Sequence, residues 1–321
     1  MEERLHGILW HWGLTPGDIR TDIELTGSPE RSLSRVVVET DRGLVILEQV
    51  PEEWVERKQR IASTLQALVD HGLGNVHPYL PPGVSAPVGS TEHLLRLGGN
   101  YWQLRPFVAG HLLPRPAYSF DEWRGVCMAD FLMDLRTCAE SAKTKLPNQP
   151  VFNLKEYAFE ILPKMERRSP GIIDALAGLR AHLTPFWRDV YPRLPRTFCH
   201  GDFHPVNVIW GDKRIESVID WEFCGPKVEG YDAALLLGCL GYEDPDHLLG
   251  EMAIACVKTL RGAGVFTALT WESLPELVMA IRFGWLREWI WRGEADALEL
   301  ELAFLDVLIR NADNLRDHWR R

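Results

Sequence analysis

The order of strand-like and helix-like segments constrains the fold of this chain more than any other feature. Alternating or β-branched runs, which favour strands, occupy residues 19–27, 32–40, 44–50, 84–88, 92–98 and 101–108. One strongly helical stretch lies among them at 51–72, and helical patterns dominate after a Gly- and Pro-bearing connector at 109–119. Strands and helices segregated in this way are typical of an α+β protein. We therefore expect a strand-rich part over residues 1–108 and a helical part over residues 109–321.

Composition and charge exclude several classes of protein. Apolar residues make up 46% and charged residues 25% of the 321 residues, which is ordinary for a globular protein and excludes wholesale disorder. A net charge of −10 disfavours non-specific binding to nucleic acid or to an anionic membrane. The first residues show no signal-peptide pattern, and the apolar run at 233–242 is too short to span a bilayer. We expect a soluble, cytoplasmic protein with neither a nucleic-acid nor a membrane partner.

The cysteines are widely spaced and contain no C-x-x-C pair. Cysteines of this kind in a cytoplasmic chain are expected to be reduced and mostly buried, and not to form a disulfide framework or a zinc site. They are Cys127, Cys138, Cys199, Cys224, Cys239 and Cys256.

A strand-like island at residues 198–223 interrupts the helical part. The chain is β-prone up to His200, passes through a loop at 201–205, and then forms a hairpin around the turn "GDKR". Asn207 opens the first hairpin strand and Asp220 closes the second. Because a hairpin returns the end of its second strand to the start of its first, these two side chains are predicted to be neighbours.

The spacing of polar residues in this island suits phosphoryl transfer. Asp202 lies in the loop, Asn207 follows five residues later, and Asp220 follows after thirteen more. A loop carboxylate near an acceptor hydroxyl can orient it and take its proton, while an amide oxygen and a second carboxylate hold Mg²⁺ against nucleotide phosphates. The same spacing of Asp and Asn occurs in the catalytic loop of protein kinases.

A metal site is the alternative for this loop. His200, Asp202 and His204 alternate, and two histidines with one carboxylate form the iron site of some oxygenases. Gly201 and Pro205, however, interrupt the strand that such an arrangement needs. We therefore assign both histidines a structural role.

The stretches "HGDFHPVNVIW" and "VIDWEF" resemble the Brenner-type motif of the aminoglycoside phosphotransferase and choline kinase superfamily. "YDAA" is similar to the segment in which that superfamily places an aspartate before a helix, here Asp232, for which we expect a role as N-cap or as a brace. The resemblance implies a two-lobed, protein-kinase-like fold, with a nucleotide-binding lobe at 1–108 and a lobe with the catalytic loop and acceptor site at 109–321. The matches to the H-G-D-x-H-x-x-N core are His200, Gly201, Asp202, His204, Pro205 and Asn207.

The resemblance also implies roles for single residues, with ATP and Mg²⁺ as cofactors. Asp202 would be the catalytic aspartate, and Asn207 and Asp220 the magnesium ligands. The segment "LRPFVAG" would be the hinge that receives adenine, through the Pro106 carbonyl and the Val108 amide. Whether the nucleotide is ATP or GTP, and the oligomeric state, stay open.

The third strand departs from the family pattern. Related chains usually carry a basic residue there that contacts the phosphates, whereas this chain has Glu48. A carboxylate about 4 Å from a phosphate oxygen would be repelled by about 4 kcal/mol at an effective dielectric constant near 20. Arg31 and Arg35, in the loop expected to cover the phosphates, can supply positive charge instead.

We predict that Glu48 forms an inverted ion pair with a base of the following helix, Arg57, Lys58 or Arg60, because an unpaired buried carboxylate costs several kcal/mol. The alternative is a register shift by one residue, which would point Glu48 to solvent and Gln49 inward.

Two functions follow from these features. The first is an ATP-dependent phosphotransferase acting on a hydroxyl group of a small molecule, such as an amino alcohol, a sugar or an aminoglycoside-like compound, and "YWQLRPFVAG" resembles the homoserine and N-acetylhexosamine kinase branch. The second is a catalytically impaired kinase-like binding protein, marked by Glu48. Trp285, Trp289 and Trp291 with Glu288 form either a wall for a cationic acceptor or part of a helical core.

Overall fold

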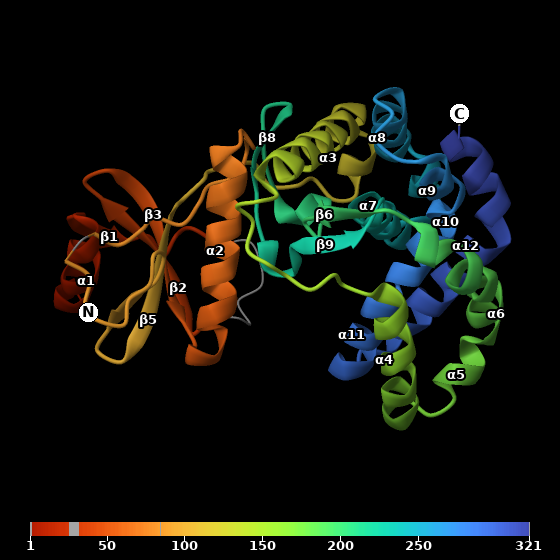
Figure 1. Cartoon of the computed structure of the whole chain (residues 1–321), viewed down its shortest axis with the longest axis horizontal. Coiled ribbons are helices and arrows are strands. Elements are labelled where there is room, and N and C mark those ends of the chain that lie inside the picture. Colours follow the sequence, from red (N-terminus) through yellow and green to blue (C-terminus); the bar gives the residue numbers. More distant parts are fainter. Residues whose placement is uncertain (1, 26–31, 84, 321) are drawn as a thin grey trace. The chain divides into compact units, whose positions relative to one another are not determined.

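The structure, a computed structural model, describes residues 2–25, 32–83 and 85–320 and divides into two compact units (Figure 1). The strand unit consists of Met1–Leu112, Thr137–Asn148 and Val206–Glu222, and the helical unit consists of Leu113–Arg136, Gln149–Pro205 and Phe223–Arg321.

The strand unit thus extends beyond the expected residues 1–108, because the segment after residue 205 bonds to it. The Val218 N–H donates to the Asn75 carbonyl (2.8 Å), and the His111 N–H donates to the Trp210 carbonyl (2.7 Å).

An antiparallel sheet with the strand order β1-β2-β3-β5-β4 forms the frame of the strand unit. The expected strands at 32–40, 44–50, 92–98 and 101–108 are confirmed. The strand expected at 19–27 is wrong: the first strand starts earlier, at a proline that an edge strand tolerates, and ends at Ile19. Residues 20–25 and 85–88 form no strand. Residues 26–31 and 84 lie outside the described residues. The strands are β1 (Pro16–Ile19), β2 (Ser34–Thr40), β3 (Gly43–Val50), β4 (Leu95–Leu97) and β5 (Asn100–Pro106).

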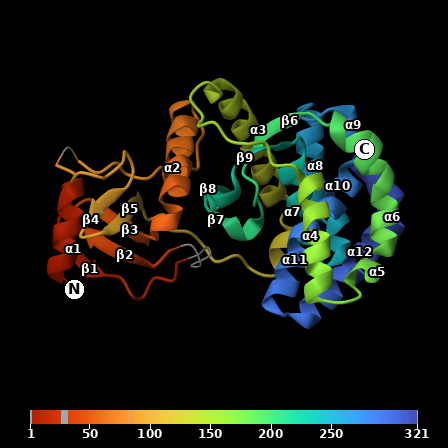
Figure 2. The ribbon, with the colours of Figure 1, turned by 60° about the horizontal axis from the view of Figure 1, so that its bottom comes forward.

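Helices α1 (Glu2–Leu9) and α2 (Val55–Asp70) cover opposite faces of this sheet (Figures 1 and 2). Successive side chains of a strand point to opposite faces. In β3, Val45 and Leu47 accordingly share a core with residues of α1, whereas Glu48 points to α2. The face under α2 therefore carries a buried charge.

The helical unit contains a short antiparallel pair, β6 (Arg196–Cys199) and β9 (Gly225–Val228), and helices that pack mainly on one another. Helix α3 starts in this unit and continues into residues of the strand unit. The helices are α3 (Glu122–Ala142), α4 (Leu154–Arg168), α5 (Ile172–Ala175), α6 (Ala177–Pro185), α7 (Tyr231–Glu243), α8 (Glu251–Gly262), α9 (Ala268–Glu272), α10 (Leu274–Ile281), α11 (Phe283–Arg292) and α12 (Ala295–Arg320). The expected α+β class is confirmed.

Helix α7 explains the apolar run at 233–242. Its residues are buried on nearly every side, and α10 packs along it, as expected of a helix that is apolar all round in a protein core. Among the helices of the described residues, none combines the length and the apolar character needed to cross a membrane.

All six cysteines fall within the described residues and are free thiols, as expected. Burial raises the pKa of the Cys239 and Cys256 thiols to about 12. These two side chains therefore stay protonated and act as small apolar residues.

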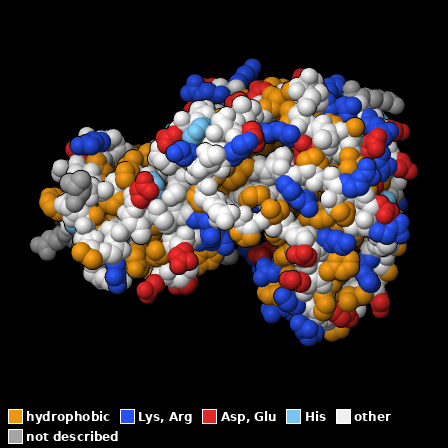
Figure 3. Space-filling model, viewed as in Figure 1, with side chains coloured by type: hydrophobic (Ala, Val, Ile, Leu, Met, Phe, Trp, Pro, Cys, Tyr) orange, Lys and Arg blue, Asp and Glu red, His pale blue; other side chains and the backbone are white. Residues whose placement is uncertain are grey.

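Charged side chains of both signs are interspersed over the face of the helical unit that Figure 3 shows. The net charge of −10 is therefore not gathered into an acidic patch on this face. The helical unit also has ion pairs at its surface, such as Arg292–Glu288 (2.7 Å) and Arg320–Glu272 (2.8 Å). Exposed pairs of this kind contribute about 1 kcal/mol or less each.

Candidate active site

The expected hairpin is present in the strand unit as β7 (Val208–Gly211) and β8 (Arg214–Val218). At its open end the Ile219 N–H donates to the Asn207 carbonyl (2.9 Å). The predicted proximity of Asn207 and Asp220 is therefore confirmed at the level of the backbone. Asp220 has a φ of 63°, a left-handed conformation that Asp adopts more readily than most residues.

In the helical unit, the loop that carries Asp202 leaves β6 through a glycine that no other residue could replace without strain. Gly201 has a φ of 87°, and a Cβ atom at this position would lie 2.2 Å from the Phe223 carbonyl oxygen. The next residue, Asp202, donates its backbone N–H to His200 Nδ1 (3.2 Å). The loop is therefore folded tightly on its own residues.

The two histidines of the loop contact different parts of Asp202. His200 is fully buried and accepts the Asp202 N–H, whereas His204 Nε2 lies 3.7 Å from Asp202 Oδ1. Within residues 2–25, 32–83 and 85–320, no three His, Cys, Asp or Glu side chains are grouped to hold a metal ion. The contacts of His200 support the structural role and count against an iron site.

Asp232 braces the loop from the first turn of α7. Its carboxylate accepts the N–H groups of His200 (2.7 Å) and Gly201 (2.8 Å). Gly230 is the N-cap of α7, so the N-cap alternative for Asp232 is wrong and the brace is confirmed. Burial raises the pKa of Asp232 to about 6, although the two N–H groups and Lys227 oppose this shift.

Replacing Asp232 with Asn is expected to destabilise the folded protein by about 1–3 kcal/mol, because the amide places an NH₂ group against one of two buried N–H donors. Urea unfolding of the wild type and the Asp232→Asn variant measures this difference. Equal unfolding free energies would show that the brace contributes no stability.

The same pair of proteins tests the titration of Asp232. Its pKa is raised in the folded state from the ordinary 3.8 of an aspartate to about 6. The stability that this group contributes is present below about pH 4 and is lost as the pH rises through about 6. The deficit of Asp232→Asn should therefore shrink between about pH 4 and pH 7, and a constant deficit would contradict the shift.

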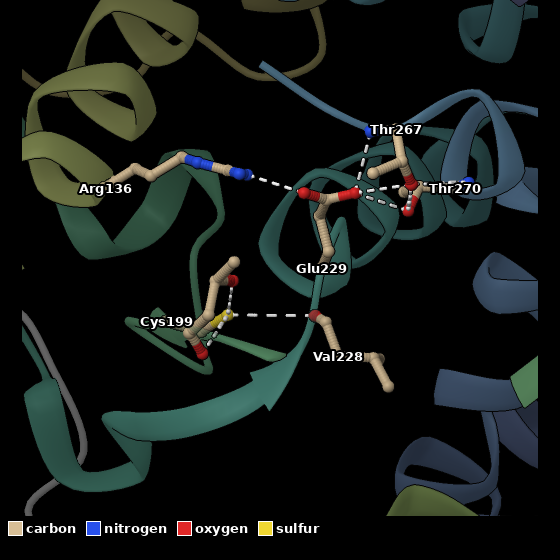
Figure 4. A network of polar contacts seen from close by, with 7 residues as sticks. Arg136, Cys199, Val228, Glu229, Thr267 and Thr270 are labelled. Carbon is tan, nitrogen blue, oxygen red and sulfur yellow. Dashed lines mark hydrogen bonds and ion pairs between the residues drawn. The ribbon is translucent and has the colours of Figure 1, made fainter. Parts of the chain in front are cut away.

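The buried carboxylate of Glu229 fixes the end of β9, next to the strand that leads into the loop (Figure 4). It accepts hydrogen bonds from the Thr267 N–H (2.8 Å), the Thr267 hydroxyl (2.9 Å) and the Thr270 hydroxyl (2.7 Å), and it pairs with Arg136 (2.8 Å). Its partners therefore come from α3 and from the start of α9. This network holds the β6–β9 pair in place.

The predicted nucleotide and metal residues all belong to the strand unit, whereas Asp202 belongs to the helical unit. Arg35 lies in β2 directly opposite Glu48 of β3. Arg31, the other arginine of the expected phosphate loop, lies outside the described residues. Among the described residues, the strand unit alone thus carries every group proposed to touch nucleotide or metal.

The residues expected to form the hinge lie at and just after the end of β5. Pro106 has no N–H and pairs with Val45, and the Phe107 N–H donates to the Leu44 carbonyl (3.0 Å). Within the described residues, the Val108 N–H has no hydrogen-bond partner. The Pro106 carbonyl and the Val108 amide therefore remain candidates for adenine contacts.

The predicted inverted pair is confirmed, with Lys58 as the base. Lys58 Nζ lies 2.8 Å from Glu48 Oε1, and both side chains are 5% exposed. The Ser32 hydroxyl donates to the same carboxylate oxygen (2.6 Å). Glu48 is buried and Gln49 instead bonds to Asn100 at the start of β5 (2.8 Å), so the register-shift alternative is wrong.

Two charged residues near the candidate site were not predicted from the sequence. In the strand unit, Glu222 Oε1 lies 2.7 Å from Lys58 Nζ. In the helical unit, the buried ammonium of Lys227 lies 5.6 Å from the ring centres of Phe152 and Tyr231 and donates to the Phe223 carbonyl. The position of Glu222, an acid two residues after Asp220, could have indicated a role near the site. No pattern in the sequence pointed to Lys227.

The tryptophans of α11 are part of the packing of the helical unit. Trp285 and Trp289 stack at 5.6 Å, and the guanidinium of Arg282 lies 5.3 Å from the Trp285 ring centre. Glu288 pairs with Arg292 of the same helix (2.7 Å). A cation of the protein itself thus occupies the proposed aromatic wall, which supports the core alternative.

Comparison with known sequences identifies relatives of the chain. The model of the phosphotransferase enzyme family matches residues 28–259. A homoserine kinase from Zymomonas mobilis subsp. mobilis is 27% identical over 207 residues, which cover 62% of this chain and 62% of the relative. The chain spans less than two thirds of the length of the homoserine kinases it matches. The match to the homoserine kinase from Xanthobacter autotrophicus covers 40% of that protein.

Solved structures share the fold. Amicoumacin kinase hAmiN in complex with AMP-PNP, Ca²⁺ and Ami superposes with a TM-score of 0.62 at 14% identity, covering 89% of this chain and 90% of that one. The microcompartment-associated aminopropanol kinase gives a TM-score of 0.62 at 15% identity, covering 99% of each chain. The expected kinase-like fold, with a sheet in its N-terminal part and helices in its C-terminal part, is therefore confirmed.

Proposed function

The chain belongs to the phosphotransferase enzyme family, and on this premise we propose that it is an ATP-dependent kinase that phosphorylates a hydroxyl group of a small molecule. The observation that carries the proposal is the hydrogen bond between the Ile219 N–H and the Asn207 carbonyl, which brings the backbones of Asn207 and Asp220 together. An amide oxygen and a carboxylate are hard donors of the kind that Mg²⁺ prefers, and Mg²⁺ fills its other positions with water and phosphate oxygens.

In this proposal each residue has one task. Asp202 accepts the proton of the acceptor hydroxyl, and the braced loop keeps its carboxylate in place. Asn207 and Asp220 would hold Mg²⁺, which when bound neutralises charge on the phosphates. Pro106 and Val108 would contact adenine, and Arg35 the phosphates.

For the acceptor we propose an amino alcohol. Two homoserine kinases match the sequence, and an aminopropanol kinase matches the fold over 99% of this chain. Both named substrates carry a hydroxyl and an amine. ATP as the phosphate donor is consistent with the AMP-PNP bound by amicoumacin kinase hAmiN, and we propose the cytoplasm, where ATP is abundant, as the location.

The impaired-kinase alternative assumes that Glu48 places an unopposed negative charge in the nucleotide site. In the strand unit that charge is compensated by Lys58 at 2.8 Å. Burial alone would raise the pKa of Glu48, but Lys58 and the Ser32 hydroxyl hold it below its usual range. Glu48 therefore acts as one half of a buried ion pair.

A thermal-shift titration tests nucleotide binding. We expect ATP with Mg²⁺ to raise the melting temperature, because a ligand at about a hundred times its dissociation constant stabilises the folded state by about 2.7 kcal/mol. GTP and ATP with EDTA are the comparisons. A melting temperature that ATP and Mg²⁺ leave unchanged would favour the binding-protein alternative.

The acceptor is tested by ADP release across amino alcohols, sugars and aminoglycosides. We expect turnover with amino alcohols that carry a primary hydroxyl. Turnover only with sugars or aminoglycosides would leave the kinase activity standing and refute the proposed acceptor class.

A further inference from the structure

Three charged side chains of the strand unit form a continuous chain of ion pairs. Lys58 Nζ of α2 lies 2.8 Å from Glu48 Oε1 of β3 and 2.7 Å from Glu222 Oε1. The exposed fractions of these side chains are 5% for Lys58, 5% for Glu48 and 9% for Glu222. One ammonium group therefore joins the sheet, helix α2 and the segment that follows Asp220.

The central lysine, Lys58, is protonated and positively charged. Burial alone would lower the pKa of Lys58, but the acidic groups of Tyr79, Glu48 and Glu222 together raise it above its usual range. Two of the three N–H groups of the ammonium are engaged by the two carboxylates. Lys58 is thus a buried cation whose contacts are already directed to protein groups.

The segment at Glu222 has further attachments to α2 and to β8. The Arg57 guanidinium donates to the Glu222 carbonyl, and its Nε lies 3.7 Å from Glu222 Oε2. The buried Trp221 indole donates to the Val218 carbonyl (2.9 Å). Both neighbours of Asp220 along the chain are therefore fixed, since Ile219 bonds to Asn207 on its other side.

Asp220 needs such fixing because its backbone has a positive φ of 63°. Conformations of this kind persist when the surrounding structure determines them. A free segment would relax toward the common negative φ and thereby redirect the Asp220 carboxylate. The ion pair between Lys58 and Glu222 opposes this relaxation two residues from Asp220.

We propose that Lys58 is a positioning residue, which fastens Glu222 to α2 and thereby holds the Asp220 carboxylate in the orientation needed to bind Mg²⁺. This inference rests on the proposed function, which makes Asp220 a magnesium ligand. The Glu48 carboxylate pairs with the same ammonium group and keeps it buried beside the sheet. The lysine acts through the protein and not through contact with the nucleotide.

Two variants that differ only at the lysine test this inference. Glu48→Gln keeps the Lys58–Glu222 pair, whereas Glu48→Gln combined with Lys58→Met removes it without leaving Glu48 as an unpaired buried charge. Hydrogen exchange of the backbone amides of residues 219–222, measured without nucleotide or metal, should be at least about tenfold faster in the double variant than in Glu48→Gln. Amides of β3 should exchange at similar rates in both variants.

Nucleotide binding gives the second measurement. In the double variant the affinity for ATP with Mg²⁺ should fall by about tenfold relative to Glu48→Gln, as is typical when a partner that orients a metal ligand is lost. The affinity for ATP with EDTA should stay within about threefold, because Lys58 does not contact the nucleotide.

The outcomes separate this inference from the proposed function. Equal exchange rates at residues 219–222 in the two variants would overturn the inference, whatever the nucleotide affinities. A loss of affinity in EDTA as large as that in Mg²⁺ would also overturn it, because Lys58 would then contact the nucleotide directly. A wild-type protein whose nucleotide affinity is independent of Mg²⁺ would refute the proposed function, while a faster exchange would still show that Lys58 fastens this segment.

Discussion

Replacing Asp202 with Asn should lower turnover by about a thousandfold and leave the affinity for ATP with Mg²⁺ within about threefold. The amide has the shape of the carboxylate but cannot accept the proton of an acceptor hydroxyl. The loop should keep its fold, because the Asp202 backbone and the Asp232 carboxylate both hold it and Asn preserves the shape of the side chain. Turnover is measured by ADP release with the best acceptor, and affinity by calorimetry.

The matched control for this variant is Asp212→Asn, the same change in the turn between β7 and β8. Its carboxylate is 99% exposed and lies 3.3 Å from a ring nitrogen of His111. Turnover of Asp212→Asn should equal that of the wild type. An Asp202→Asn variant that retains more than about a tenth of wild-type turnover would exclude Asp202 as the general base.

Features that depend on residues close in the sequence could be predicted. The alternation of β2, β3 and β5 and the hairpin that brings Asn207 to Asp220 are local patterns, and each was found where the sequence indicated. The partner of Glu48 could also be anticipated, because a buried carboxylate requires a base and α2 offered three. Only the structure selects Lys58 among them.

Features that depend on distant residues could not be predicted. Glu222 meets Lys58 although the two are far apart in the sequence, and no periodic pattern reports such a contact. From the sequence alone, the tryptophans of α11 are compatible with a site for a cationic ligand and with a helical core. The structure decides for the core, because Arg282 lies against them and donates to Glu301, which is distant in the sequence. The role of Asp232 depended on where α7 begins, and a left-handed glycine at its N-cap decided it.

Replacing Asp220 should affect nucleotide binding, whereas replacing Asp202 should affect turnover. In Asp220→Ala, the part of the nucleotide affinity that requires Mg²⁺ should be abolished, so that affinities in Mg²⁺ and in EDTA become equal. The reason is that the variant loses a charged oxygen donor, while the adenine contacts proposed at Pro106 and Val108 remain.

The conformation of Asp220 requires a second variant. Alanine at a φ of 63° costs about 1–2 kcal/mol, so a loss in Asp220→Ala alone would combine strain with the loss of a ligand. Asn tolerates this conformation and keeps the shape of the side chain, so Asp220→Asn should lose most of the Mg²⁺-dependent affinity with little loss of stability. If Asp220→Asn binds ATP with Mg²⁺ as the wild type does, Asp220 is not the metal ligand.

The two-histidine alternative makes a different prediction for the same preparations. Metal analysis of the purified wild type should find neither iron nor zinc at about one per chain, because the ligands proposed here are hard oxygen donors. Iron or zinc at that level, lost on replacing His200 or His204, would move the metal to the Asp202 loop. Asp220→Asn would then keep its metal, whereas in the present assignment it is the variant that loses Mg²⁺.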